Sequence, residues 1–173
     1  MFTVKLDGFD ELTNGLEEVS AYLTDMTPLM QTIGEILASN TKRRIIEGVQ
    51  PDGIPFAPKL ATTIERYLTK REGMDSRPLI HTGTMSEEIA SEAGPDWVEV
   101  GASRKYVAVM QFGAPKGSLG TYAGIDKNGK AYSGAAPWGD IPARPFLGIS
   151  AQDEQLIQDE FYEILRGFFE GLR

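Results

Sequence analysis

Two stretches of the chain repeat their apolar residues at spacings of three and four, which is typical of helices with one buried face. The stripe near the amino terminus consists of Phe9, Leu12, Leu16, Val19 and Leu23. The stripe near the carboxyl terminus consists of Ile157, Phe161, Ile164, Phe168 and Leu172. Ser150 can cap the second helix, and Asp153 lies in its first turn. We therefore expect a helix near each end of the chain.

A longer helix is expected from Thr27 to Gly48. Thr27 can cap it, and Pro28 suits its first position because proline lacks the N–H that would have no helical partner there. The residues expected on its inner face are Met30, Ile33, Leu37, Arg44 and Ile45. Gly48 marks the end of the pattern. About 20 helical residues would span roughly 30 Å, which is long for a domain of this size.

Strand patterns are shorter. Residues 2–6 alternate apolar and polar side chains, which is typical of a strand with one buried face. Residues 84–92 and 96–102 are expected to form two antiparallel strands joined at Gly94-Pro95, since the second segment is rich in strand-forming residues. Residues 106–112 are apolar and rich in β-formers, so a third strand is expected there, with a short helix as the alternative.

The remaining segments carry turn residues. Residues 49–60 contain Pro-Asp-Gly and are interpreted as a loop, followed by a short helix over residues 62–70. Residues 113–140 hold much glycine and alanine but few large apolar side chains, so we expect a long exposed loop. Within it, Asp126-Lys-Asn-Gly129 is interpreted as a hairpin tip.

Together these elements predict an α+β fold formed by residues 1–173 as a single domain. A small antiparallel sheet packs against the long helix and the C-terminal helix, and residues 113–140 form the exposed glycine-rich loop. Residues 1–26, with a strand and a helix, could serve as an arm. A chain of 173 residues can bury roughly 70% of the surface that its unfolded form exposes, which is enough for a real core.

Composition narrows the functional classes. The chain has no cysteine, which excludes disulfides and thiolate metal sites and fits a reducing cytoplasm. The amino terminus lacks the basic and then apolar pattern of a secretory signal, and no run of about 18 apolar residues is present, so no membrane span is expected. A soluble intracellular protein is the expectation.

The charge distribution is uneven along the chain. The net charge of −8 argues against general nucleic-acid binding, because phosphate contacts need clustered cations. Residues 41–71 and 101–150 each carry a net charge of +4, whereas the three segments around them are acidic. Such alternation could place opposite charges on two faces, as a head-to-tail oligomer requires. An ordinary mixed surface is the alternative interpretation.

Catalytic motifs are incomplete. Gly124 to Lys130 matches the first seven positions of a phosphate-binding loop, but Ala131 occupies the position where Ser or Thr would hold magnesium. His81 is the sole histidine, and no Gly-x-Ser-x-Gly elbow accompanies it, so a small hydrolase is the less favoured alternative. We expect no catalytic residues, no metal and no cofactor.

One basic run, Lys42-Arg43-Arg44, lies on the long helix. It could contact nucleic-acid phosphates, which is the alternative function that we keep. Consecutive cations fan around a helix rather than forming one stripe, so ion pairs with acidic segments or a neighbouring subunit are favoured. Trp138 lies in the glycine-rich loop, where an exposed indole would suit an interface.

Two segments in the second half carry a family signature, Tyr106-Val-Ala-Val-Met-Gln-Phe-Gly113 and Ile141-Pro-Ala-Arg-Pro-Phe-Leu-Gly148. Pro145 disfavours helical geometry at Arg144, so this arginine is expected in an extended docking edge, anchored by a buried Phe146-Leu147 plug. Further elements fit in order: Pro51-Asp52-Gly53, Pro58, Pro78-Leu79-Ile80 before Thr82-Gly83, and Val98-Glu99-Val100-Gly101. From about Met30 to its end, the chain resembles the phage virion morphogenesis (tail completion) family.

The resemblance implies a structural protein, made in the host cytoplasm, that completes the phage tail and supports a stable head–tail joint without catalysis. Its subunits are expected to form a ring through heterologous contacts and to meet tail tube or head–tail connector proteins. The guanidinium fork of Arg144 would suit a carboxylate in such a contact. The candidate interface residues are Arg144, Phe146, Trp138, Gln111, Lys42, Arg43 and Arg44. The chain departs from the family pattern at Ile54-Pro55-Phe56, where tryptophan often follows the Pro-Asp-Gly turn.

Overall fold

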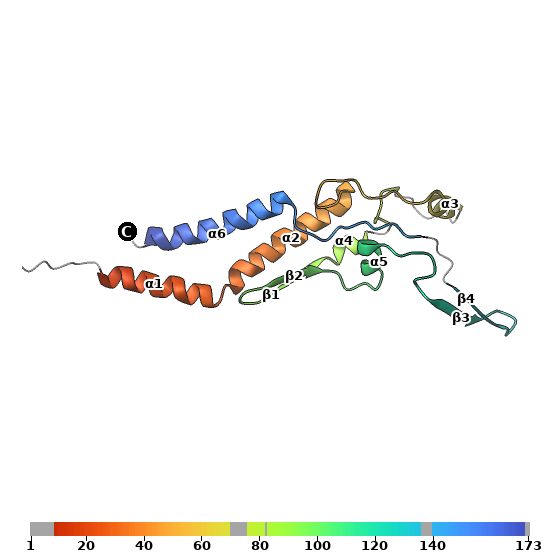
Figure 1. The fold of residues 1–173 in the computed structure, drawn as a ribbon, viewed down its shortest axis with the longest axis horizontal. Helices are drawn as coiled ribbons and strands as arrows, with labels where there is room; N and C mark the ends of the chain where they lie inside the picture. Colours follow the sequence, from red (N-terminus) through yellow and green to blue (C-terminus); the bar gives the residue numbers. More distant parts are fainter. Residues whose placement is uncertain (1–8, 70–75, 82, 136–139, 172–173) are drawn as a thin grey trace, which may run out of the picture. The chain divides into compact units, whose positions relative to one another are not determined.

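The computed structural model describes residues 9–69, 76–81, 83–135 and 140–171 of the chain (Figure 1). These residues belong to two compact units, each assembled from separate segments of sequence. Unit 1 comprises residues 1–40, 90–101 and 149–173, and unit 2 comprises residues 41–89 and 102–148. The strand predicted at residues 2–6 and the predicted interface residue Trp138 lie outside the described residues.

Helices outnumber strands in the described residues. The helices are α1 (Phe9–Thr24), α2 (Thr27–Glu47), α3 (Ala61–Thr69), α4 (Thr84–Glu87), α5 (Val107–Phe112) and α6 (Ala151–Gly171). The strands are β1 (Ala90–Ala93), β2 (Val98–Gly101), β3 (Thr121–Ile125) and β4 (Ala131–Ala135). They form two separate antiparallel ribbons, β1–β2 and β3–β4. The predicted α+β class is confirmed, and α2 contributes its first part to unit 1 and its last turns to unit 2.

The core of unit 1 is built on α2. Leu29, Ile33 and Leu37, spaced by four residues on one helix face, are buried together. The partly buried apolar residues that pack against them come from α1, the α1–α2 link, α2, β2 and α6: Tyr22, Met26, Met30, Val98, Val100, Ile157, Phe161 and Ile164. The predicted packing of a small sheet and a C-terminal helix against the long helix is therefore observed.

A glycine brings α2 close to the ribbon. A Cβ at Gly34 would lie 2.9 Å from the Cβ of Ser91 and 3.0 Å from a methyl of Val98. Any larger residue at this position would push β1 and β2 away from the helix, so Gly34 sets the depth at which the ribbon packs.

The start of α6 is tied to α2 by one buried carboxylate. Asp153 is 1% exposed, and its Oδ2 accepts hydrogen bonds from the N–H and the hydroxyl of Ser150, both at 2.8 Å. The N–H of Asp153 donates back to Ser150 Oγ at 3.1 Å, which completes a capping box in which Asp replaces the usual Glu. The other oxygen, Oδ1, accepts a hydrogen bond from Asn40 Nδ2 at 2.6 Å. The predicted Ser150 cap is confirmed.

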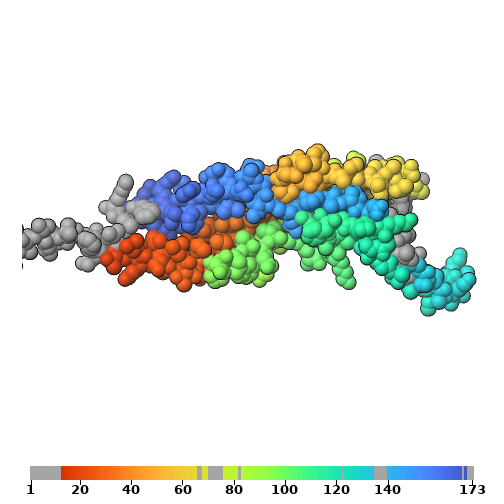
Figure 2. Space-filling view, viewed as in Figure 1, coloured from red at the N-terminus to blue at the C-terminus, as the bar shows by residue number. Residues whose placement is uncertain are grey.

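Helix α1 lies beside α6 (Figure 2). The rings of Tyr22 and Phe168 meet edge to face at 5.2 Å. Two members of the predicted apolar stripe, Leu16 and Leu23, are nevertheless 58% and 48% exposed. The helix is thus confirmed, but part of its apolar stripe faces solvent.

Two predicted strands are corrected by the structure. Residues 84–87 form α4 rather than the start of a strand, because Gly83 (φ 83°) turns the chain and its carbonyl accepts the N–H and the hydroxyl of Ser86. Residues 107–112 form α5, so the alternative of a short helix holds and the sheet has no third strand there. Strand propensity depends on sheet context, and this segment has no neighbouring strand to pair with in the described structure.

The predicted loop at residues 113–140 contains the β3–β4 hairpin. Its register runs from Thr121 opposite Ala135 to Ile125 opposite Ala131. The predicted tip is confirmed: the carboxylate of Asp126 accepts the N–H groups of Asn128 and Lys130 at 2.8 and 2.9 Å. No described side chain from residue 115 to residue 134 is buried, so the hairpin is exposed as expected but is more regular than a loop.

Among the described residues, no helix is long and apolar enough to cross a membrane.

Candidate functional site

The signature segment, residues 141–148, belongs to unit 2 and carries two buried side chains. Phe146 is fully buried and Arg144 is 7% exposed. The predicted Phe146-Leu147 plug is therefore confirmed for Phe146, whereas Leu147 is half-buried. Three side chains hold this segment and together form what we call the clasp: Gln111 from α5, and Arg144 and Phe146 from the segment itself. The backbone carbonyls of Ala57 and Pro58 complete the clasp.

Arg144 is anchored to backbone on two sides. Its N–H donates to the Met110 carbonyl at 2.8 Å. Its guanidinium donates from Nε to the Ala57 carbonyl at 2.6 Å and from Nη2 to the Pro58 carbonyl at 2.7 Å. Burial lowers the pKa of this guanidinium from its ordinary value, because desolvation disfavours the charged form. The guanidinium fork thus binds two carbonyls of the same unit, whereas the sequence predicted a carboxylate at an interface.

Gln111 takes the place of a neighbouring strand. Its Oε1 accepts the N–H groups of Phe146 and Leu147, each at 3.0 Å, and its Nε2 donates to the Leu147 carbonyl at 2.9 Å. One side-chain amide thus satisfies three main-chain groups that no sheet reaches. The helical conformation of α5, which the sequence did not favour, carries this amide.

Gly113 allows the two signature segments to approach each other. Its backbone has φ 73° and ψ 177°, a region that is almost confined to glycine. A Cβ there would lie 2.7 Å from the Ile141 carbonyl oxygen and 2.8 Å from the Ala143 nitrogen. The next residue, Ala114, pairs with Ile141 in an isolated antiparallel bridge.

Phe112 lies between the two inward-facing residues and points outward. It is 78% exposed, whereas Gln111 and Gly113 on either side are engaged with residues 141–147. The Gln-Phe-Gly motif therefore combines two structural residues with one aromatic ring held at the surface. Sequence reasoning missed Phe112, although its position between Gln111 and Gly113 was a usable signal.

Arg44 is not part of a surface strip. It is 6% exposed, and its Nη2 donates to Thr41 Oγ1 at 3.1 Å and to the Gly148 carbonyl at 3.0 Å. Lys42 is half-buried and Arg43 is exposed, with Arg43 Nε 3.9 Å from a Glu47 oxygen. The prediction of a surface strip at Lys42-Arg43-Arg44 is thus wrong for Arg44. This residue lies on the inner face of α2 and binds the end of residues 141–148.

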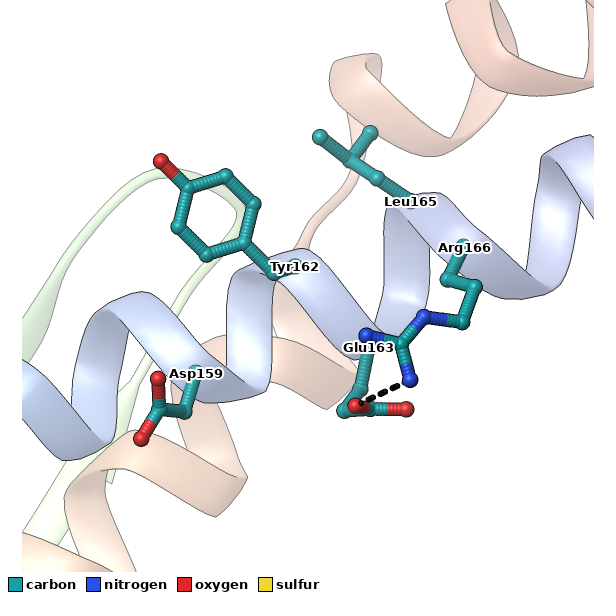
Figure 3. A pocket seen from close by; sticks show the side chains of 5 residues that line it. All are labelled: Asp159, Tyr162, Glu163, Leu165 and Arg166. Atoms are coloured by element: carbon teal, nitrogen blue, oxygen red, sulfur yellow. Dashed lines mark ion pairs between the residues drawn. The ribbon is translucent and has the colours of Figure 1, made fainter.

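The remaining candidate chemistry is sparse. His81 is exposed. In the described part of the chain, no three His, Cys, Asp or Glu side chains converge as metal ligands. A surface hollow is lined by residues of α6 alone: Asp159, Tyr162, Glu163, Leu165 and Arg166 (Figure 3). Glu163 and Arg166 pair with each other at 2.8 Å, and the lining includes no histidine, serine or cysteine.

The fold and the clasp thus describe a small α+β protein whose signature residues hold its own chain together. Residues 7–166 match the model of the phage virion morphogenesis family, and the chain belongs to that family. It is 26% identical over 170 residues to "Mu-like prophage FluMu G protein 2" of Haemophilus influenzae, covering 96% of this chain and all of that protein. It is 27% identical over 154 residues to "Tail completion protein S" of Escherichia phage P2, covering 87% and 89% of the two chains. No solved structure matches it.

Proposed function

We propose that this protein completes the phage tail and supports the joint between tail and head as a ring of identical subunits. The observation that carries the proposal is the family match over residues 7–166, nearly the whole chain. A relative that aligns over most of both chains is named for tail completion. Assembly in the host cytoplasm, and a final position at the head–tail junction of the virion, are part of the proposal.

The exposed apolar residues support an oligomer. Unit 2 presents Phe112, 78% exposed, and Ile125 on the hairpin, 74% exposed. Unit 1 presents Leu16 and Leu23 on α1. Exposed aromatic and aliphatic anchors of this kind are typical of protein interfaces. Two unlike patches on one subunit suit a heterologous contact, which repeats around a closed ring.

The interface role that the sequence suggested for the clasp becomes indirect. Arg144, Gln111 and Phe146 are engaged within unit 2, so we propose that they hold Phe112 and the base of the hairpin in place for a partner. Lys42 and Arg43 remain candidates for direct contact. Without Arg44, the basic run offers two cations to a phosphate backbone, and this disfavours the nucleic-acid alternative.

Deletion of the coding sequence in the phage that carries it tests the proposal. We expect separate heads and tails by negative-stain electron microscopy, and joined virions again when the protein is supplied from a plasmid. A plasmid encoding Phe112→Ser should restore joining poorly, whereas Gln158→Ala, at an exposed position of α6, should restore it fully. Joined, infectious virions in the deletion strain would overturn the proposal.

Light scattering over a concentration series tests the ring directly. We expect a discrete mass several times that of the 19.0 kDa subunit, and closed rings by negative stain. If the deletion strain fails to join heads to tails but the purified protein stays monomeric even with its tail partners, the proposal of tail completion stands. The proposal of a ring is then overturned.

A further inference from the structure

The stem of the β3–β4 hairpin lacks the usual protection of an edge strand. Residues 117–125 and 131–135 contain no charged side chain. Natural sheets cover their edges or place lysine, proline or bulges there, because unpaired N–H and C=O groups recruit other strands. A lone two-stranded ribbon is marginally stable in water, and this one has no buried side chain among its described residues. The open edges of the β3–β4 hairpin are therefore suited to pairing with a strand of a partner.

One face of the hairpin is uncharged and carries mostly small side chains. The register places Thr121, Ala123, Ile125, Ala131 and Ser133 on the same face, and all five are exposed. On the opposite face, the ring of Tyr132 lies over Gly124, where a Cβ would fall 2.5 Å from its hydroxyl oxygen. Small side chains on the first face allow another backbone to approach closely. In Figure 2 the hairpin (cyan) stands out from the rest of unit 2 on the face shown.

The tip of the hairpin is cationic. The carboxylate of Asp126 is engaged by the N–H groups of Asn128 and Lys130, which directs its charge into the turn. The side chains of Lys127 and Lys130 are exposed, and neither forms an ion pair with another residue of the described ranges. A partner surface should therefore be acidic.

The β1–β2 ribbon of unit 1 supplies the complementary surface. Glu92 lies directly opposite Glu99 in the register, and both are exposed. Like charges at facing positions destabilise a ribbon. Neither carboxylate has an ion-pair partner within the described structure, and no described strand pairs with the outer edge of β1 or β2. This ribbon therefore lacks both a neighbouring strand and a cation.

We infer that the β3–β4 hairpin of one copy lies along the β1–β2 ribbon of a second copy, with Lys127 and Lys130 facing Glu92 and Glu99. The inference rests on the proposed ring and specifies its contact. Strand addition satisfies the open edges of both ribbons, and the cations offset the repulsion between the glutamates. Because the two patches differ, each copy can give a hairpin to one neighbour and accept one from another.

Other acidic surfaces fit the hairpin less well. Glu17 and Glu18 lie on α1, and Asp159 and Glu163 lie on α6. A helix satisfies its backbone groups internally, so it offers no edge to a strand. Glu163 is in addition already paired with Arg166. Of these three acidic surfaces, the β1–β2 ribbon is the one that combines carboxylates with an open strand edge.

Cross-linking tests the inference in the full-length protein, because the natural chain has no cysteine. Lys127→Cys protein carrying a tag is mixed with untagged Glu92→Cys protein and treated with a short bismaleimide. We expect a tagged–untagged dimer, which can form only between two copies. The matched control replaces the second variant with Glu17→Cys, an exposed glutamate on α1, and should give at least tenfold less dimer.

Charge reversal provides an independent readout by light scattering. Lys127→Glu with Lys130→Glu should weaken self-association at least tenfold, and so should Glu92→Lys with Glu99→Lys. An equimolar mixture of the two double variants should recover association. Where the variants alternate, a reversed hairpin meets a reversed ribbon at one contact and an unchanged hairpin meets an unchanged ribbon at the next. Circular dichroism checks that each variant is folded.

The outcomes separate the two proposals. If the charge-reversal variants keep the oligomer mass of the wild type and the cysteine variants do not cross-link, the hairpin contact is overturned. The proposal of a ring still stands. A protein that is monomeric at every concentration overturns both. Charge-reversal variants could also keep the oligomer mass of the wild type but fail to join heads to tails. This result would mean that the lysines contact another partner, such as a tail protein or DNA, and it would overturn the contact between hairpin and ribbon.

Discussion

The clasp and the β3–β4 hairpin belong to the same unit, yet they use their residues in opposite ways. In the clasp, Phe146 is fully buried and the polar groups of Arg144 and Gln111 are satisfied by backbone. In the hairpin, no described side chain is buried and the stem carries no charge. Apart from the exposed Phe112, the signature residues described here therefore maintain the fold. The hairpin, which is also placed to meet a partner, lies outside the signature segments.

The difference predicts where substitutions act. Changes in the clasp remove packing or leave part-buried carbonyls without donors, so they should lower the free energy of unfolding. Changes on the exposed hairpin should alter stability by about 0.5 kcal/mol or less and act on association instead.

The largest expected effect comes from Phe146→Ala. Truncating a fully buried phenylalanine should lower the free energy of unfolding by about 3–5 kcal/mol, measured by urea titration. Phe112→Ala is the matched control, since the same truncation at a 78% exposed position should cost about 0.5 kcal/mol or less. Equal losses in the two variants would contradict the assignment of inner and outer aromatic residues.

Arg144→Ala should lower the free energy of unfolding by about 2–3 kcal/mol, because the Ala57 and Pro58 carbonyls lose a charged donor. Arg144→Lys keeps the charge without the fork and should recover part of this loss. Assembly of both variants should fall in step with stability. A variant of wild-type stability that fails to assemble would instead place Arg144 in direct contact with a partner.

Gly113→Ala should destabilise the protein by about 1–3 kcal/mol, since its backbone region excludes a Cβ and the space is occupied by residues 141–143. Gly129→Ala, in the hairpin turn, is the control: φ is also positive at 80°, but no atom lies within 4 Å of the added Cβ. Its cost should stay near 1 kcal/mol. A reversed order would mean that the turn, not the clasp, limits stability.

The smallest effect concerns an ion pair of unit 2 outside both regions. The Arg104 guanidinium donates to the carboxylate of Glu88 through two nitrogens and lowers the pKa of that carboxyl. Because the folded-state pKa lies below the unfolded one, the stabilisation is present above the unfolded pKa. It is lost as pH falls through the folded pKa. Arg104→Gln should raise the pKa of Glu88 towards the ordinary glutamate value in an NMR titration. An unchanged pKa would rule out the pair in solution.

The sequence predicted the elements whose causes are local. The cap at Ser150, the stop at Gly48 and the hairpin tip at Asp126 each depend on residues within a few positions. The sequence failed at α5, because its β-forming residues adopt a helix whose Gln111 binds the main chain 35 and 36 residues further on.

The hydrogen-bond partners of Arg144 could not be predicted from the sequence either. Its acceptors are carbonyls 86 and 87 residues away, and a carbonyl has no side-chain signature. Arg44 shows a conflict between two patterns: helical spacing placed it on the inner face, whereas its neighbours in the basic run suggested a surface strip. Burial shows that the spacing was the better guide.

The capping box on α6 has a consequence for synthesis of the protein. Asn40 and Asp153, which tie α2 to α6, are separated by 113 residues. A ribosome adding about 5–20 residues per second needs on the order of ten seconds to make that stretch. During this time Leu29, Ile33 and Leu37 lack the helix that covers them. A chain that ends before α6 would leave this apolar face uncovered, and exposed apolar surface of this kind makes incomplete chains prone to aggregation.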